Sequence, residues 1–66
     1  MIGKPKFEVG DKVKFRMDDE YIVGEIYIVD KWGTFWDDTE VQYDVMVESQ
    51  KILYKHINEK SLEAVN

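Results

Sequence analysis

Aromatic rings next to carboxylates form the most distinctive chemical grouping in this sequence. The run from Trp32 to Asp38 holds three large aromatic side chains followed by two adjacent aspartates. Ring faces attract cations through their quadrupoles, and nearby carboxylates add Coulombic attraction. The run therefore predicts a site that binds a cationic side chain. The residues predicted to bind are Trp32, Phe35, Trp36, Asp37, Asp38 and Tyr43.

A structural role for the tryptophans is the alternative. A chain of 66 residues buries little apolar surface. Trp32, Trp36 or both would then fold back as a lid over a core too small to close otherwise. The sequence leaves both interpretations open.

Other reactive side chains form no recognisable catalytic or metal-binding pattern. His56 is the only histidine, and no cysteine is present to complete a zinc site or a nucleophile pair. The acidic runs 18–20 and 37–40 could offer oxygen ligands to Ca²⁺ or Mg²⁺, but neither has the spacing of an EF-hand loop. Gly24 and Gly33 belong to no phosphate-binding motif. We therefore expect no enzyme activity, no metal and no cofactor.

Composition indicates one folded domain. Hydrophobic residues make up 44% of the chain and aromatic residues 14%, which favours folding over disorder. Without cysteine the domain must fold by packing alone. No apolar run reaches the length of about 18 residues that a membrane span needs, so we expect a cytoplasmic protein with no membrane contact. Residues 1–6 are predicted to be a flexible lead-in, and residues 7–66 a single domain.

The net charge of −5 is distributed unevenly. Residues 1–16 carry five basic and two acidic side chains, whereas residues 17–49 carry one basic and ten acidic. A general nucleic-acid binder presents a basic face, so this balance makes nucleic acid an unlikely partner. The first part of the chain nevertheless offers a local basic patch. Its members would be Lys4, Lys6, Lys12, Lys14 and Arg16.

Strand patterns dominate the first half of the chain. Val13 and Phe15 alternate with basic residues, which predicts a half-buried strand, and the polar residues 17–20 read as a hairpin loop. The run 21–30 is β-branched and aromatic around Gly24. It therefore predicts a long strand, bent at the glycine, that can serve two sheets.

The second half contains two more strands and a short last one. Residues 31–40 show no regular period and are predicted to form a long loop. Residues 41–48 alternate cleanly, and residues 52–55 return as the hairpin partner. A single 3-10 turn at 58–61 and a last strand at 62–65 are expected to follow. A C-terminal helix from Asn58 is the alternative, although so short a helix is marginal.

Two local motifs resemble those of SH3-like barrels. The run 9–15, Val-Gly-Asp-Lys-Val-Lys-Phe, followed by Gly-Glu-Ile at 24–26, resembles the opening of Tudor-like and KOW-like barrels. The run 54–62 resembles the turn and final strand that close them. The resemblance covers about residues 7–65 and implies an all-β, five-stranded SH3-like barrel with one 3-10 turn before the last strand. The whole chain also looks like small uncharacterised SH3-like proteins of Gram-positive bacteria and their phages.

Such barrels bind peptides, modified side chains, RNA or DNA, so the fold alone does not select a function. We expect a small binding module that contacts a peptide or protein of basic character through the aromatic and acidic loop. A KOW-like nucleic-acid contact through the basic first strand is the alternative. The chain is expected to be a monomer or a weak homodimer. A dimer would use an apolar patch formed by Tyr27, Val29, Trp32 and Met46.

The alternation also predicts which side chains form the core. We expect one contiguous buried cluster of apolar residues from all the predicted strands. Its members are Val13, Phe15, Ile22, Ile26, Ile28, Tyr43, Val45, Val47, Leu53, Ile57 and Leu62.

Overall fold

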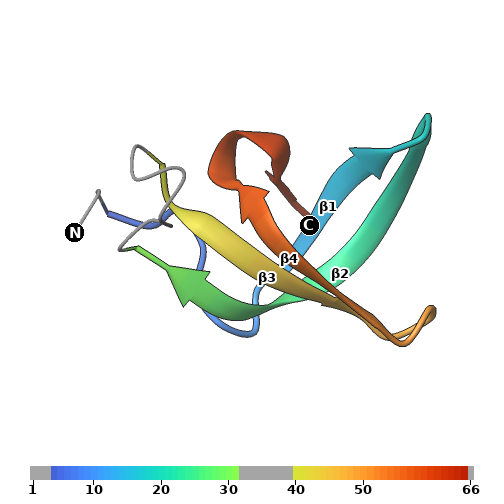
Figure 1. The fold of residues 1–66 in the computed structure, drawn as a ribbon, viewed down its shortest axis with the longest axis horizontal. Helices are drawn as coiled ribbons and strands as arrows, with labels where there is room; N and C mark the ends of the chain where they lie inside the picture. The colour runs from blue at the N-terminus through green and yellow to red at the C-terminus, as the bar shows by residue number, and fades with distance from the viewer. Residues whose placement is uncertain (1–3, 32–39, 66) are drawn as a thin grey trace.

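The computed structural model describes residues 4–31 and 40–65, and these form one antiparallel sheet of five strands (Figure 1). The strand order across the sheet is β4-β3-β2-β1-β5. The prediction of an all-β chain with one 3-10 turn before the last strand is confirmed. The elements are β1 (Lys12–Met17), β2 (Glu20–Asp30), β3 (Gln42–Val47), β4 (Ile52–Asn58), the 3-10 turn η1 (Glu59–Ser61) and β5 (Glu63–Ala64).

A two-residue turn joins β1 to β2. Asp18 and Asp19 both have positive φ, 51° and 66°. Such turns match the right-handed twist of paired strands, and aspartate tolerates the left-handed region better than most residues. Arg16 forms an ion pair of 3.1 Å with Asp19 at the exposed turn. The predicted hairpin is therefore confirmed.

Strand β2 pairs with two different partners along its length. Residues 20–25 pair with β1 and residues 25–30 pair with β3. At the change of partner, a Cβ on Gly24 would lie 2.5 Å from Val45 Cγ1 and 2.7 Å from the Met46 carbonyl oxygen. Only glycine allows so close an approach. The strand bent at Gly24 and shared between two halves of the sheet is confirmed, and Figure 1 shows it curving from the β1 side to β3.

Two β-bulges reset which side chains face inward. One lies in β2 between Ile26 and Ile28, and the other lies in β4 opposite Asp44. In the second bulge His56 has a φ of 60°, and its N–H donates to Asp44 Oδ1 over 3.2 Å. A bulge inserts one residue and so reverses the alternation beyond it. Beyond the first bulge, Val29 packs against the core and Ile28 is 45% exposed.

The core matches most of the predicted cluster. Two predicted members are wrong: Ile28 is turned outward by the bulge, and Leu53 pairs with Met46 on the outer face. Two residues outside the predicted cluster, Phe7 and Val41, are buried. The buried apolar residues are Phe7, Val13, Phe15, Ile26, Val41, Tyr43, Val45, Val47 and Leu62, with Ile22, Val29, Tyr54 and Ile57 packed against them.

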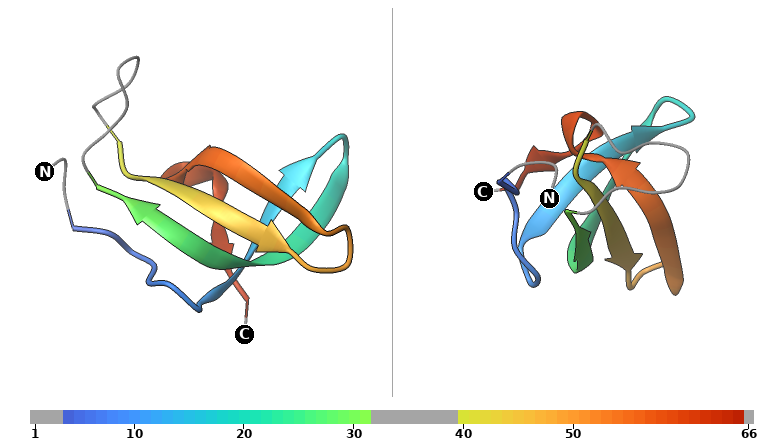
Figure 2. Two further views of the ribbon diagram at one scale, coloured as in Figure 1. Left: turned by 60° about the horizontal axis from the view of Figure 1, so that its bottom comes forward. Right: turned by 60° about the vertical axis from the view of Figure 1, so that its left-hand side comes forward.

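The 3-10 turn carries the chain from one sheet edge to the other. The Glu59 N–H donates to the Val41 carbonyl over 3.1 Å, which fixes the start of the turn against β3. Leu62 then enters the core, and β5 pairs with β1 through Val13 and Ala64 (Figure 2). The alternative of a C-terminal helix is wrong. Because the buried Leu62 needs an extended connection to reach the core, packing overrides the helical propensity of this segment.

A hydrogen-bonded cluster fastens the N-terminal segment to the core. The Tyr43 hydroxyl donates to Glu59 Oε2 over 2.5 Å and accepts from the Phe7 N–H over 3.4 Å. The same carboxylate oxygen accepts from the Lys6 N–H over 3.0 Å. Burial, together with the hydrogen bond to Glu59, raises the pKa of Tyr43 to about 12. Tyr43 is fully buried, so its ring helps to hold the fold together.

Candidate functional site

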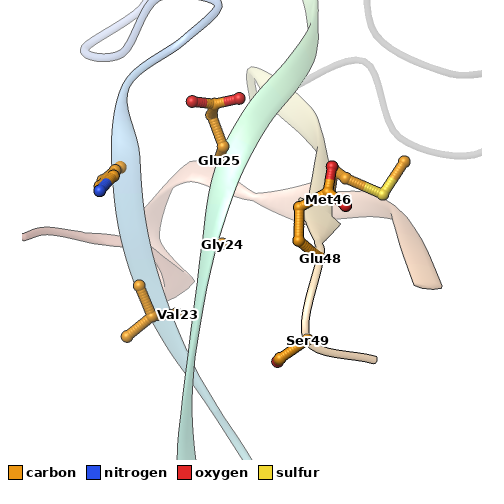
Figure 3. A pocket seen from close by; sticks show the side chains of 7 residues that line it. Val23, Gly24, Glu25, Met46, Glu48 and Ser49 are labelled. Carbon is orange, nitrogen blue, oxygen red and sulfur yellow. The ribbon is translucent and has the colours of Figure 1, made fainter. Parts of the chain in front are cut away.

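A groove opens on the outer face of the sheet where β2 leaves β3 (Figure 3). The two strands are in close contact at Gly24. Beyond that point β2 turns to pair with β1 alone, while β3 continues into its hairpin with β4. The divergence leaves a hollow of about 310 Å³. Its walls are Val23, Gly24 and Glu25 on β2, Met46, Glu48 and Ser49 on the β3 side, and Lys12 on β1.

The groove combines apolar walls with acidic ones. Val23 is 52% exposed and, with Met46, offers an apolar strip. Within the described part of the chain, neither the Glu25 nor the Glu48 carboxylate takes part in an ion pair or hydrogen bond. Lys12 is the one cationic side chain among the lining residues, so the lining carries an excess of negative charge. This arrangement suits a cation on an aliphatic stem.

Exposed aromatic side chains continue this face along β2. Tyr21 is 59% exposed and Tyr27 is 56% exposed. Lys14 Nζ lies 5.2 Å from the centre of the Tyr21 ring, within the range of a cation–π contact. The outer face of β2 thus already holds one cation against an aromatic ring. The predicted apolar patch exists only in part, because Val29 packs against the core and Trp32 lies outside the described residues.

The predicted binding site lies almost entirely outside the described residues, so it stays a prediction. Five of the predicted binding residues, Trp32, Phe35, Trp36, Asp37 and Asp38, lie outside the described residues. The sixth, Tyr43, is fully buried in the core. Just after the undescribed run, Glu40 accepts the Lys60 N–H over 3.0 Å and forms an ion pair of 3.9 Å with its ammonium. The chain is therefore fixed to the 3-10 turn at Glu40, just before β3.

The basic side chains of β1 are largely neutralised by acidic neighbours. Lys14 forms an ion pair of 3.6 Å with Glu63 of β5. Arg16 is paired with Asp19 at the hairpin turn. Of the three outward-facing cations on this strand, Lys12 alone has no acidic partner in the described residues. β1 therefore presents little free positive charge to a phosphate backbone.

A second hollow, of about 570 Å³, separates the N-terminal segment from the end of β2. The hollow is lined by the apolar residues Pro5, Phe7, Val9 and Val29 and by the charged residues Lys4, Glu8 and Lys31. It lies near the start of the run 32–39, which the structure does not describe. Its charge is opposite in sign to that of the groove over Gly24.

The described residues contain neither a cluster of metal-ligating side chains nor a membrane-spanning helix. No group of three or more His, Cys, Asp or Glu side chains in them could hold a metal ion. Nor does any helix in them have the length and hydrophobicity to cross a membrane. The lone histidine, His56, contributes its backbone N–H to a bulge.

Comparison with family models, with curated proteins and with solved structures gave no match to this chain.

The groove itself was missed by sequence reasoning. Glu25 and Glu48 are far apart in the sequence, and only the register that pairs Glu25 with Met46 places them around one hollow. The available signal was Gly24, which marked where the strands approach and then separate.

Proposed function

We propose that this protein is a small SH3-like barrel that works as a binding module for a basic segment of a peptide or protein. A bent second strand shared by two halves of the sheet supports the barrel assignment. So does a 3-10 turn that returns the last strand to β1. Because such barrels serve many functions, the partner must be argued from the surface.

The groove over Gly24 is the observation that carries this proposal. A lysine or arginine side chain can lay its methylene groups against Val23 and Met46 and place its charge near Glu25 and Glu48. Lys12 lies opposite Glu25, but neither carboxylate forms an ion pair or a side-chain hydrogen bond among the described residues. A basic ligand therefore gains attraction without breaking an existing ion pair.

The aromatic and acidic run from Trp32 to Asp38 provides a second contact for the same class of partner. Its three aromatic side chains suit a cation or its aliphatic stem, and its aspartates repeat the charge of the groove. Trp36→Ala should weaken binding of a basic peptide if this run takes part. Equal binding by the wild type and this variant would restrict the site to the groove.

Fluorescence anisotropy with a labelled peptide of alternating lysine and valine tests the groove. We expect Glu25→Gln combined with Glu48→Gln to weaken binding about tenfold, since two exposed ion pairs contribute roughly 0.7 kcal/mol each. Asp18→Asn is the matched control, because it removes one carboxylate at the β1–β2 turn, away from the groove. Equal affinity in the double variant and the wild type would refute the groove as the site.

The nucleic-acid alternative gains no support from the ion pairs of β1. Lys14 and Arg16 already have acidic partners. We expect no binding to mixed-sequence DNA or RNA at about 50 mM salt, where phosphate contacts are strong. Binding that disappears in Lys12→Ala would instead establish the KOW-like function.

A further inference from the structure

The backbone of β2 has an unpaired edge that faces the groove. Residues 20–24 pair with β1 on one side, and the ladder with β3 begins only at Glu25. The Ile26 N–H donates to the Asp11 carbonyl, and the Ile26 carbonyl accepts from the Gly10 N–H, both over 2.9 Å. Ile26 therefore directs its backbone groups to the β1 side.

Alternation extends this assignment back along the strand. Backbone groups in an antiparallel pair point to opposite sides at successive residues. Ile22 and Gly24 therefore point toward β1, as Ile26 does, whereas Tyr21 and Val23 point away from it. Two N–H donors and two carbonyl acceptors thus face the side where the groove lies, and no described strand pairs with them.

The other edges of the sheet are less suited to accept a strand. The free edge of β4 is interrupted by the bulge at His56, and β5 is only two residues long. Bulges and short edge strands are the usual protection against pairing with another chain. The edge from Tyr21 to Val23 contains neither proline nor lysine. Its side chains are β-branched or aromatic, which favours strand pairing.

We propose that the partner binds as an added β-strand along Tyr21–Val23, with its basic side chains directed to the acidic groove. This inference rests on the proposed function and names the conformation of the bound segment. Charge selects the occupant: Glu20 and Glu25 lie at the ends of this edge, and Glu48 lies across the groove. A second copy of this chain would bring like charges together, whereas a basic strand would neutralise them.

Amide hydrogen exchange measured by NMR, with and without the alternating lysine–valine peptide, tests the inference. We expect the amides of Tyr21 and Val23 to become protected at least tenfold, because the added strand accepts hydrogen bonds from both. The amides of Ile22 and Gly24 already face β1 and should change less than twofold. Binding of the peptide with unchanged exchange at Tyr21 and Val23 would overturn strand addition while leaving the proposed function intact.

A peptide with the same side chains but with N-methylated backbone amides is the matched probe. Each lost hydrogen bond should weaken binding about fivefold. Equal affinity for the two peptides would overturn the inference. If neither peptide binds, the proposed function fails as well. Protection of Tyr21 and Val23 that rises with protein concentration in the absence of peptide would identify a second copy as the occupant and overturn the basic partner.

Discussion

Gly24→Ala tests how tightly the bend in β2 is pressed against β3. The added Cβ would lie 2.7 Å from the Met46 carbonyl oxygen, where ordinary contact begins at 3.4 Å. The two backbones must therefore separate by about 0.7 Å at this point. Separation strains the adjoining ladder at the pairs Glu25–Met46 and Ile26–Val45.

The expected cost is large for so small a domain. Overpacking costs about 1–3 kcal/mol, and one weakened ladder hydrogen bond adds about 1 kcal/mol. The sum of about 2–4 kcal/mol compares with a total stability of about 3–10 kcal/mol for a chain of this length. At about 4–8 °C per kcal/mol, the melting temperature should fall by at least about 8 °C.

Urea and thermal unfolding of the variant measure this cost, and a second substitution identifies its cause. Val45→Ala removes the methyl group that lies 2.5 Å from the new Cβ. It should therefore lower the free energy of unfolding less in the Gly24→Ala background than in the wild type. Gly10→Ala is the control background, because a Cβ there meets nothing within 4 Å and is disfavoured only by its φ of 98°. A melting temperature for Gly24→Ala within 2 °C of the wild type would refute this account of the bend.

Three further predictions concern the core, the buried tyrosine and a turn. Ile26→Ala should lower the free energy of unfolding in urea by about 2–5 kcal/mol, and Ile28→Ala should lower it by less than about 1 kcal/mol. The reason is that the bulge buries the Ile26 side chain and exposes that of Ile28. Equal losses in the two variants would contradict the bulge. The pKa of Tyr43 rises from 10.0 to about 12 on folding, so between these pH values the unfolded chain loses the hydroxyl proton while the folded chain keeps it. The contribution of Tyr43 to the free energy of unfolding is therefore constant below pH 10 and falls by about 1.4 kcal/mol per pH unit from pH 10 to pH 12. The difference from Tyr43→Phe in unfolding titrations isolates that slope, and identical slopes would refute it. Lys51→Gly should stabilise the β3–β4 hairpin by about 0.5–1 kcal/mol, because Lys51 has a φ of 56°. Ser49→Gly is the control and should not stabilise it. A higher melting temperature for Ser49→Gly than for Lys51→Gly would exclude relief of strain at Lys51.

The regular alternation of apolar residues made most of the fold predictable. The two hairpins, the bend at Gly24 and the 3-10 turn follow from local residue types, whereas β4 extends to Asn58, beyond the predicted end at residue 55. The bulges did not follow, because a bulge depends on how two strands meet and leaves no residue signature here. This is why Ile28 was misplaced. Leu53 was misplaced for a related reason: its face is set by its pairing with Met46.

The candidate site was less accessible to sequence reasoning than the fold. Aromatic residues next to acids predict a site at Trp32–Asp38, a run outside the described residues. The groove instead depends on the separation of β2 from β3, which is a tertiary feature. Tyr43 shows the same limit: its ring could line a site or fill a core, and only the burial of its strand face decides between them.

Isothermal titration of the unmodified protein with two peptides tests the central claim most directly. One peptide alternates lysine with valine, and the other replaces every lysine with glutamate. The acidic groove predicts that the lysine peptide binds, that its affinity falls as salt is raised, and that the glutamate peptide does not bind. Equal or tighter binding of the glutamate peptide would contradict the claim and would direct attention to the hollow between Lys4 and Lys31.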